Sequence, residues 1–148
     1  MRIYLDVCCL NRPFDDQSQE RIRLESEAVK LVLDLVAKDL HAWISSEAVE
    51  YEVSRHPNEE QRTNVQVLVA QASERLSLDT QAATRAAQLQ SAGIPPMDAV
   101  HLAVAERHGC DVFLTTDDTL LRRVARLGKR LELRVANPVQ WIAEVLEP

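Results

Sequence analysis

The chain has 148 residues, of which 46% are hydrophobic and three are glycine, so its length and composition suit one globular domain covering residues 1–148 and exclude a disordered protein. The net charge of −6 argues against simple electrostatic attachment to nucleic acid. No apolar run approaches the roughly 20 residues of a membrane-spanning helix, and the chain opens Met-Arg-Ile-Tyr-Leu-Asp. We therefore expect a soluble, cytoplasmic protein with no membrane partner.

Short apolar runs alternate with longer segments of helical period along the chain. We expect strands over residues 2–6, 41–45, 75–78, 111–115 and 131–135. We expect helices over residues 20–38, from 47 to just before 57, from 59 to about 72, over 80–92, 97–108 and 118–127, and from 138 onward. The segment 7–13 predicts a turn, and the polar segment 14–19 predicts an exposed, mobile loop.

Residues with a preference for helix ends mark several of these boundaries. Ser46, Asn58 and Asp79 stand where a side-chain oxygen would cap the first turn of a helix. Gly93 fits the left-handed position that follows a helix, and Pro96 fits the first turn of the next one. Short strands that alternate with helices predict an α/β fold whose strands pair in parallel through right-handed crossovers.

Two smaller features leave alternatives open. Cys8 and Cys9 are adjacent and Cys110 is distant, so neither a disulfide framework nor a zinc spacing is indicated, and reduced packing residues are expected. Six cations gather within 13 residues: Arg122, Arg123, Arg126, Lys129, Arg130 and Arg134. A solvated helix face with cations at its C-terminus and a phosphate-contacting patch explain them equally well.

Four acids lie at strand ends or in helices where an acidic side chain calls for a functional explanation. Asp6 ends the first strand and Asp117 follows the strand over 111–115, and in parallel sheets the functional crevice lies beyond such strand ends. Asp98 is the single acid in an apolar, Ala-rich helix, and Glu52 shares its helix with Glu47 and Glu50. We expect Asp6, Glu52, Asp98 and Asp117 to converge as a catalytic, metal-binding cluster.

A divalent metal ion gives these acids a common purpose. Mg²⁺ and Mn²⁺ prefer oxygen ligands, and like charges brought together without an ion would force some carboxylates to take up protons. Each acid also has an ordinary explanation: Asp98 suits the helix dipole, Asp117 or Asp118 suits a helix cap, and Glu50 competes with Glu52.

No other catalytic constellation competes with the acids. The sequence has neither a Gly-x-Ser-x-Gly elbow nor a Gly-rich phosphate loop after its first strand. The four histidines show no metal spacing. His101 follows Asp98 by three positions and could contact it, but a satisfied, partly buried histidine is the better interpretation.

At these acids the sequence resembles the PIN-domain family of metal-dependent ribonucleases, which includes the VapC-type toxins of bacterial toxin–antitoxin pairs. The strand ending in Asp6 is similar to the family's N-terminal Leu-Asp motif, and Ser46 followed by Glu52 is similar to its second acidic motif. The run Asp98-Ala99-Val100-His101-Leu102-Ala103 matches its Asp-Ala-x-x-x-Ala helix, and Leu114-Thr115-Thr116-Asp117 matches its Thr-x-Asp strand end.

The resemblance implies a three-layer α/β/α sandwich around a central, mainly parallel sheet. It also implies that Asp6, Asp98 and Asp117 hold Mg²⁺ or Mn²⁺, that Glu52 assists as a ligand or through water, and that Thr115 or Thr116 orients the site. One departure stands out: the family usually has Thr or Ser and then Ser or Asn directly after the first Asp, whereas Val7-Cys8-Cys9 follow Asp6 here. Asn11 is a candidate substitute for the missing hydroxyl.

The leading functional hypothesis is therefore a metal-dependent endoribonuclease that cleaves single-stranded RNA, acting as the toxin of a type II toxin–antitoxin pair. The alternative is a non-catalytic module of the same fold that binds RNA or protein. Expected partners are the RNA substrate and a small antitoxin protein. The helix over 20–38 and the C-terminal helix could also support a homodimer, although core packing explains both equally well.

Overall fold

Five short segments, most of them apolar, pair into one parallel sheet in the computed structural model, which describes residues 1–147. The strands are β1 (Arg2–Leu5), β2 (Ala42–Ser46), β3 (Glu74–Leu76), β4 (Val112–Leu114) and β5 (Arg134–Ala136). Their order across the sheet is β3-β2-β1-β4-β5, and every neighbouring pair is parallel. The predicted α/β class with a parallel sheet is confirmed.

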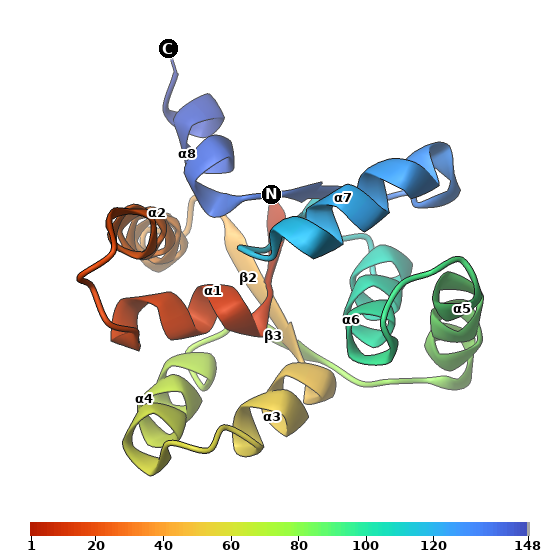
Figure 1. The fold of residues 1–148 in the computed structure, drawn as a ribbon, viewed down its shortest axis with the longest axis horizontal. Helices are drawn as coiled ribbons and strands as arrows, with labels where there is room; N and C mark the ends of the chain where they lie inside the picture. The colour runs from red at the N-terminus through yellow and green to blue at the C-terminus, as the bar shows by residue number, and fades with distance from the viewer. Residues whose placement is uncertain (148) are drawn as a thin grey trace.

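Helices cover both faces of this sheet. The α-helices are α1 (Val7–Asn11), α2 (Glu20–Ala37), α3 (Glu47–Ser54), α4 (Glu59–Val69), α5 (Thr80–Ser91), α6 (Pro96–Arg107), α7 (Asp118–Leu127) and α8 (Pro138–Leu146), and η1 (Arg12–Phe14) and η2 (Gly128–Arg130) are short 3-10 helices. Figure 1 shows α2 and α4 on one side of the strands and α5 and α6 on the other. Across residues 1–147, none of the helices combines the length and apolar character needed to cross a membrane.

The predicted helix caps form as expected. Ser46, Asn58 and Asp79 each accept a hydrogen bond from a backbone N–H in the first turn of α3, α4 and α5, at 3.2, 2.9 and 2.8 Å. Gly93 follows α5 with a φ of 104°, a conformation that a side chain would strain. These local signals explain why most helix boundaries could be located from the sequence.

The Ala-rich helix α6 is buried because it packs against both the sheet and α5. Ala99, Leu102, Ala103 and Ala105 are fully inaccessible to solvent. Small side chains at these positions let the neighbouring backbones approach closely, and α5 contributes buried alanines of its own. The single acid of the first turn, Asp98, therefore belongs to a helix half of whose residues are buried.

One N-terminal segment differs from the sequence-based expectation. The predicted turn over 7–13 is helical: α1 begins directly after Asp6 and continues into η1. The segment 14–19 is exposed as expected, since four of its six residues are exposed and none is buried. Asp15 within it accepts hydrogen bonds from Arg12 and Gln61, each at 2.9 Å.

The basic stretch behaves mostly as a solvated helix end. Arg130 donates to the carbonyl oxygens of Arg126 and Leu127 at the end of α7, and Arg134 pairs with Glu144 at 2.5 Å. Since residues 128–130 form η2, the last strand begins at Arg134, three residues later than predicted.

Replacing Leu102 by Ala should lower the free energy of unfolding by about 2–5 kcal/mol, because the deletion leaves a cavity between α6 and the sheet. Leu24→Ala is the matched control: Leu24 is 52% exposed on α2, so the same deletion there should change stability by less than about 0.5 kcal/mol. Urea unfolding of the two variants measures the difference, and equal losses would contradict this account of the core.

Candidate metal centre

The adjacent strands β1 and β4 end side by side and deliver acids to the same edge of the sheet. Leu5 is in register with Leu114, and the backbone N–H of Asp6 donates to the carbonyl oxygen of Leu114 at 3.0 Å. Asp6 follows β1 directly, and Asp117 follows β4 by three residues. Parallel pairing thus brings together two carboxylates that are 111 positions apart in the sequence.

Asp6 is a buried carboxylate with several hydrogen-bond donors. It is 5% exposed, caps α1 by accepting the Val7 N–H at 2.9 Å, and accepts the Thr115 hydroxyl at 2.8 Å. Burial raises its pKa above the ordinary value, while the neighbouring His101 and the Thr115 hydroxyl oppose the rise. A charge that is costly to bury is held in a fixed orientation here.

A buried chain of hydrogen bonds connects the sheet to Glu52. Ser46 Oγ lies 2.7 Å from the Tyr4 hydroxyl, which lies 2.7 Å from His101 Nδ1, and His101 Nε2 lies 2.9 Å from Glu52 Oε1. An ionised carboxylate only accepts hydrogen bonds, so Nε2 carries a proton and donates it to Glu52. Tyr4 and His101 are fully buried, and Glu52 is therefore oriented by the core of the protein.

Three of these groups come close enough together to surround a cation. One oxygen of Asp6, one oxygen of Glu52 and one ring nitrogen of His101 all lie within 4.8 Å of one another, and this is the one such group found over residues 1–147. Both ring nitrogens of His101 already have hydrogen-bond partners. The donors left for a cation are carboxylate oxygens, the type of ligand that Mg²⁺ and Mn²⁺ prefer.

The protonation of His101 reflects this acidic setting. Burial alone would lower its pKa, but the hydrogen bond to Glu52 and the negative charges of Asp6, Glu52 and Asp98 raise it above the ordinary value. The expected satisfied histidine is confirmed, with Tyr4 and Glu52 as its hydrogen-bond partners, but it is fully buried and not partly buried as predicted.

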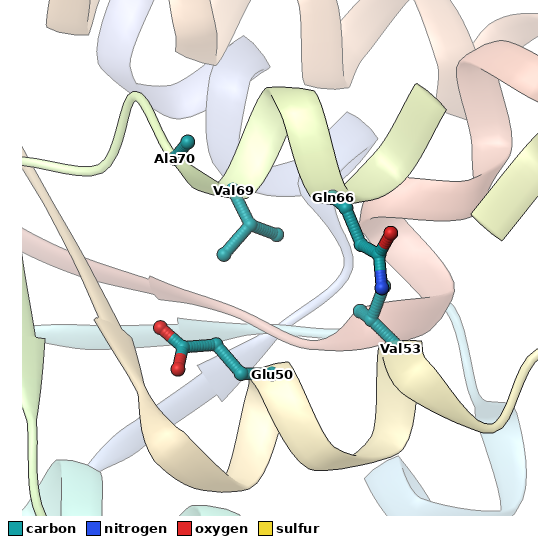
Figure 2. Close-up of a pocket in the computed structure, with 5 residues that line it drawn as sticks. All are labelled: Glu50, Val53, Gln66, Val69 and Ala70. Carbon is teal, nitrogen blue, oxygen red and sulfur yellow. The ribbon is translucent and has the colours of Figure 1, made fainter. Parts of the chain in front are cut away.

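Glu50 points away from this cluster. Arg75 Nε donates to Glu50 Oε2 at 2.7 Å, and the Glu50 side chain points into the space between α3 and α4 (Figure 2). Val53 and Val69 line the same space. Glu52, and not Glu50, therefore lies beside His101 and Asp6.

The negative charges of neighbouring acids affect the pKa of Asp98. It lies half-buried in the first turn of α6, where burial, together with the negative charges of Asp6 and Asp117, raises its pKa to about 6. Asp98 does not belong to the group of three within 4.8 Å, but it is near enough to Asp6 and Asp117 for their charges to act on its pKa. A bound cation would relieve the repulsion among these charges.

Asp117 stands at the exposed side of the site. It caps α7 by accepting the N–H groups of Thr119 and Leu120 at 2.9 and 3.2 Å, and its own N–H donates to Thr115 Oγ1 at 3.1 Å. Thr115 therefore contacts both strand-end acids. The next residue, Asp118, pairs instead with Arg21 at 2.6 Å.

Cys8 occupies the site in a way that the sequence did not suggest. Its thiol lies 3.4 Å from Asp6 Oδ2 and 3.3 Å from Thr115 Oγ1, and it accepts the Thr116 N–H at 3.3 Å. The thiol is thus within hydrogen-bond distance of the first acid and of the threonine that also contacts it. Asn11, the suggested substitute, has no hydrogen bond to Asp6, and among the described residues its carboxamide oxygen is buried without a partner.

The sequence also gave no sign of the support behind Asp117. Glu25 of α2 is 1% exposed and accepts hydrogen bonds from Arg12 Nε at 2.9 Å and Asn137 at 2.7 Å. Arg21, which also contacts Glu25, donates to the Thr116 carbonyl oxygen at 3.2 Å and so holds the segment just before Asp117. No local pattern distinguishes the buried Glu25 from the exposed Glu27 of the same helix.

Comparison with protein families identifies the class. The family model described as the PIN domain matches residues 3–127, so the chain belongs to the PIN domain family. Comparison with curated protein sequences found no significant match.

Solved structures with a similar fold include three toxin–antitoxin complexes. The chain resembles VapBC2 from Rickettsia felis bound to a promoter DNA fragment, with a TM-score of 0.63, 16% identity, and coverage of 93% of this chain and 98% of that one. DNA-bound VapBC from Salmonella typhimurium gives 0.59 and 19%, and VapBC-1 from nontypeable Haemophilus influenzae gives 0.61 and 15%, both with the same coverages. Identities this low show a shared fold.

The position of Cys8 predicts selective thiol chemistry. N-ethylmaleimide should modify Cys8 in the folded protein and leave Cys9 and Cys110 unmodified, because Cys8 is partly exposed and the other two are buried. Mass spectrometry of proteolytic peptides locates the modified thiol. Cys8→Ser is the control and should take up no reagent while folded; modification of Cys9 or Cys110 at a comparable rate would contradict the arrangement.

Proposed function

We propose that the protein is a metal-dependent endoribonuclease that cleaves single-stranded RNA by metal-activated water. The observation that carries this proposal is the close approach of Asp6 and Glu52, whose carboxylate oxygens lie within 4.8 Å of each other just beyond the end of β1. We assign Asp98 and Asp117 to the same site because the negative charges of Asp6 and Asp117 act on the pKa of Asp98. The chain belongs to the PIN domain family. Its resemblance to that family at these positions implies metal-dependent cleavage of RNA. Repelling carboxylates, one of which has its pKa raised to about 6, fit the donor set of a hard divalent cation.

In this proposal the residues of the site have distinct roles. Asp6, Asp98 and Asp117 hold Mg²⁺ or Mn²⁺, and Glu52 serves as a ligand or holds a water molecule through its carboxylate. Thr115 and the Cys8 thiol fix the direction of Asp6, and His101 fixes that of Glu52. A metal bound there would supply a hydroxide nucleophile at neutral pH and stabilise the charge on the phosphate.

The alternative, a non-catalytic module of the same fold, loses one of its supports. The missing hydroxyl after Asp6 favoured it, but the Cys8 thiol makes the corresponding contacts to Asp6 and Thr115. The net charge of −6, which disfavours attachment to RNA, still favours a module that binds protein. Calorimetric titration with Mn²⁺ separates the two, since a protein that binds no metal would support the module and overturn the nuclease.

Replacing Asp98 by Asn should reduce metal-dependent RNA cleavage by at least about 100-fold, because a direct ligand matters at least as much as outer-shell partners, whose loss typically costs 10–100-fold. The fold should survive, since Asn has the same size and removes one of several repelling charges. The metal-free variant should therefore unfold at a temperature equal to or above that of the wild type at neutral pH.

Asp34→Asn is the matched control, because Asp34 is 54% exposed on α2 and, within residues 1–147, pairs only with Lys38, at 2.8 Å. Its cleavage rate should equal that of the wild type. Retained cleavage in Asp98→Asn would remove Asp98 from the metal centre.

We further propose that this ribonuclease is the toxin of a two-component pair. The structural neighbours were solved as VapBC complexes, and a small antitoxin that lays an apolar helix on the protein and places a cation near the acids would suit the site. Co-expression of a small protein encoded beside this gene should suppress RNA cleavage. Undiminished cleavage in the presence of that protein would overturn the toxin assignment and leave the ribonuclease intact.

A further inference from the structure

The largest cavity beside the acidic cluster is lined partly by apolar side chains. It measures about 530 Å³ and lies where α1, α3 and the start of α6 meet, with Val7 and Met97 as apolar walls. Glu52 lines it too, so whatever occupies this cavity lies directly beside the proposed metal centre. The remaining lining residues include one aromatic side chain, one arginine and one histidine.

Tyr51 and Arg55 form a stacked pair on this cavity. Tyr51 is 53% exposed, and the Arg55 guanidinium lies 5.6 Å from the centroid of its ring. Within residues 1–147 Arg55 takes part in no ion pair, so its N–H donors are available to a ligand. Exposed aromatic rings and arginine planes are the surfaces on which unpaired bases stack in proteins that bind single-stranded RNA.

Two polar groups complete the lining. The Asn58 N–H donates to His56 Nδ1 at 3.1 Å, which leaves Nε2 of the neutral ring protonated and free to donate to a ligand. Asn11 also lines the cavity, but its carboxamide oxygen is buried and is not presented to a ligand. The cavity therefore offers stacking together with a hydrogen bond from His56 to a base edge.

The ring of Tyr51 also borders a second hollow. This space measures about 310 Å³, shares Tyr51 and Met97 with the first, and extends toward Leu78 and Ala48. Its acid, Glu47, is engaged by the Leu78 N–H at 2.5 Å. Tyr51 thus stands between two hollows, and a chain of unpaired nucleotides can pass along it.

We propose that the cavity between α1, α3 and α6 is a nucleobase subsite, in which an unpaired base of single-stranded RNA stacks on Tyr51 and Arg55 next to the scissile phosphate. This inference rests on the proposed ribonuclease function and adds to it the residues that hold the substrate. In an acidic protein that cannot attract RNA by net charge, stacking supplies the affinity, and Arg55 supplies a local positive charge at the rim of the acidic site.

Binding of a fluorescent, single-stranded oligoribonucleotide of mixed sequence tests the subsite. Fluorescence anisotropy is measured in the Asp98→Asn background, so that the probe stays intact. Adding Tyr51→Ala should weaken binding by roughly 5- to 150-fold, the range typical for the loss of one stacked base, while Tyr51→Phe should retain the affinity. Arg55→Ala should weaken binding as well.

Phe14→Ala is the matched control, because Phe14 is an exposed aromatic residue, 38% accessible, that lines a different hollow beside Asn58 and Gln61. It should leave the affinity unchanged. Ultraviolet cross-linking followed by mass spectrometry should attach the probe to the peptide that contains Tyr51. Unchanged affinity in Tyr51→Ala, or an equal loss in Phe14→Ala, overturns the subsite.

A second measurement separates this inference from the function on which it rests. Tyr51→Ala with Asp98 intact should bind Mn²⁺ as the wild type does. A wild-type protein that cleaves RNA with Mn²⁺ while Tyr51→Ala keeps full RNA affinity overturns the subsite alone. A wild-type protein that neither cleaves nor binds the oligoribonucleotide overturns both.

Discussion

Repulsion among carboxylates gathered at one edge of the sheet is the constraint on which the arrangement of the site depends. The protein meets it with hydrogen-bond donors placed by the backbone: Asp6 accepts from the Val7 N–H, and Asp117 from the N–H groups of Thr119 and Leu120. Each strand-end acid is therefore also a helix cap, so the site and the start of a helix form as one structure. The capping explanation and the metal explanation of these acids do not compete.

Buried residues of the core orient Glu52, the second acid of the site. Tyr4 lies in the central strand, and its hydroxyl links Ser46 at the end of β2 to His101 in the middle of α6. Glu52 is the outer end of this buried chain, 35% exposed at its side chain, while His101 is inaccessible. Changes deep in the sheet would thus move Glu52, and the precision of the site derives from the packing of β1 and α6.

The sequence predicted the parts of the molecule that depend on local rules. Helix caps such as Ser46 and Asp79 follow from side-chain chemistry within one turn, and strand-end acids follow from the topology of parallel sheets. Side-chain direction was out of reach: Glu50 and Glu52 differ only by the face of α3 on which they lie. The role of the Cys8 thiol was missed for the same reason, because its partners at Thr115 and Thr116 are more than 100 positions away.

The acidic net charge of the chain is compatible with a nucleic-acid substrate, because four of the acids lie in the proposed metal site. Removing the four site acids from the 23 Asp and Glu leaves 19 against 17 Lys and Arg, a nearly neutral balance. A cation held by those acids would turn the most negative part of the surface into a place where a phosphate can bind. Cations such as Arg134 are engaged locally, whereas Arg55 lies over Tyr51 beside the site. The proposed RNA path along α3 lies where this positive charge and the exposed aromatic surface of Tyr51 coincide.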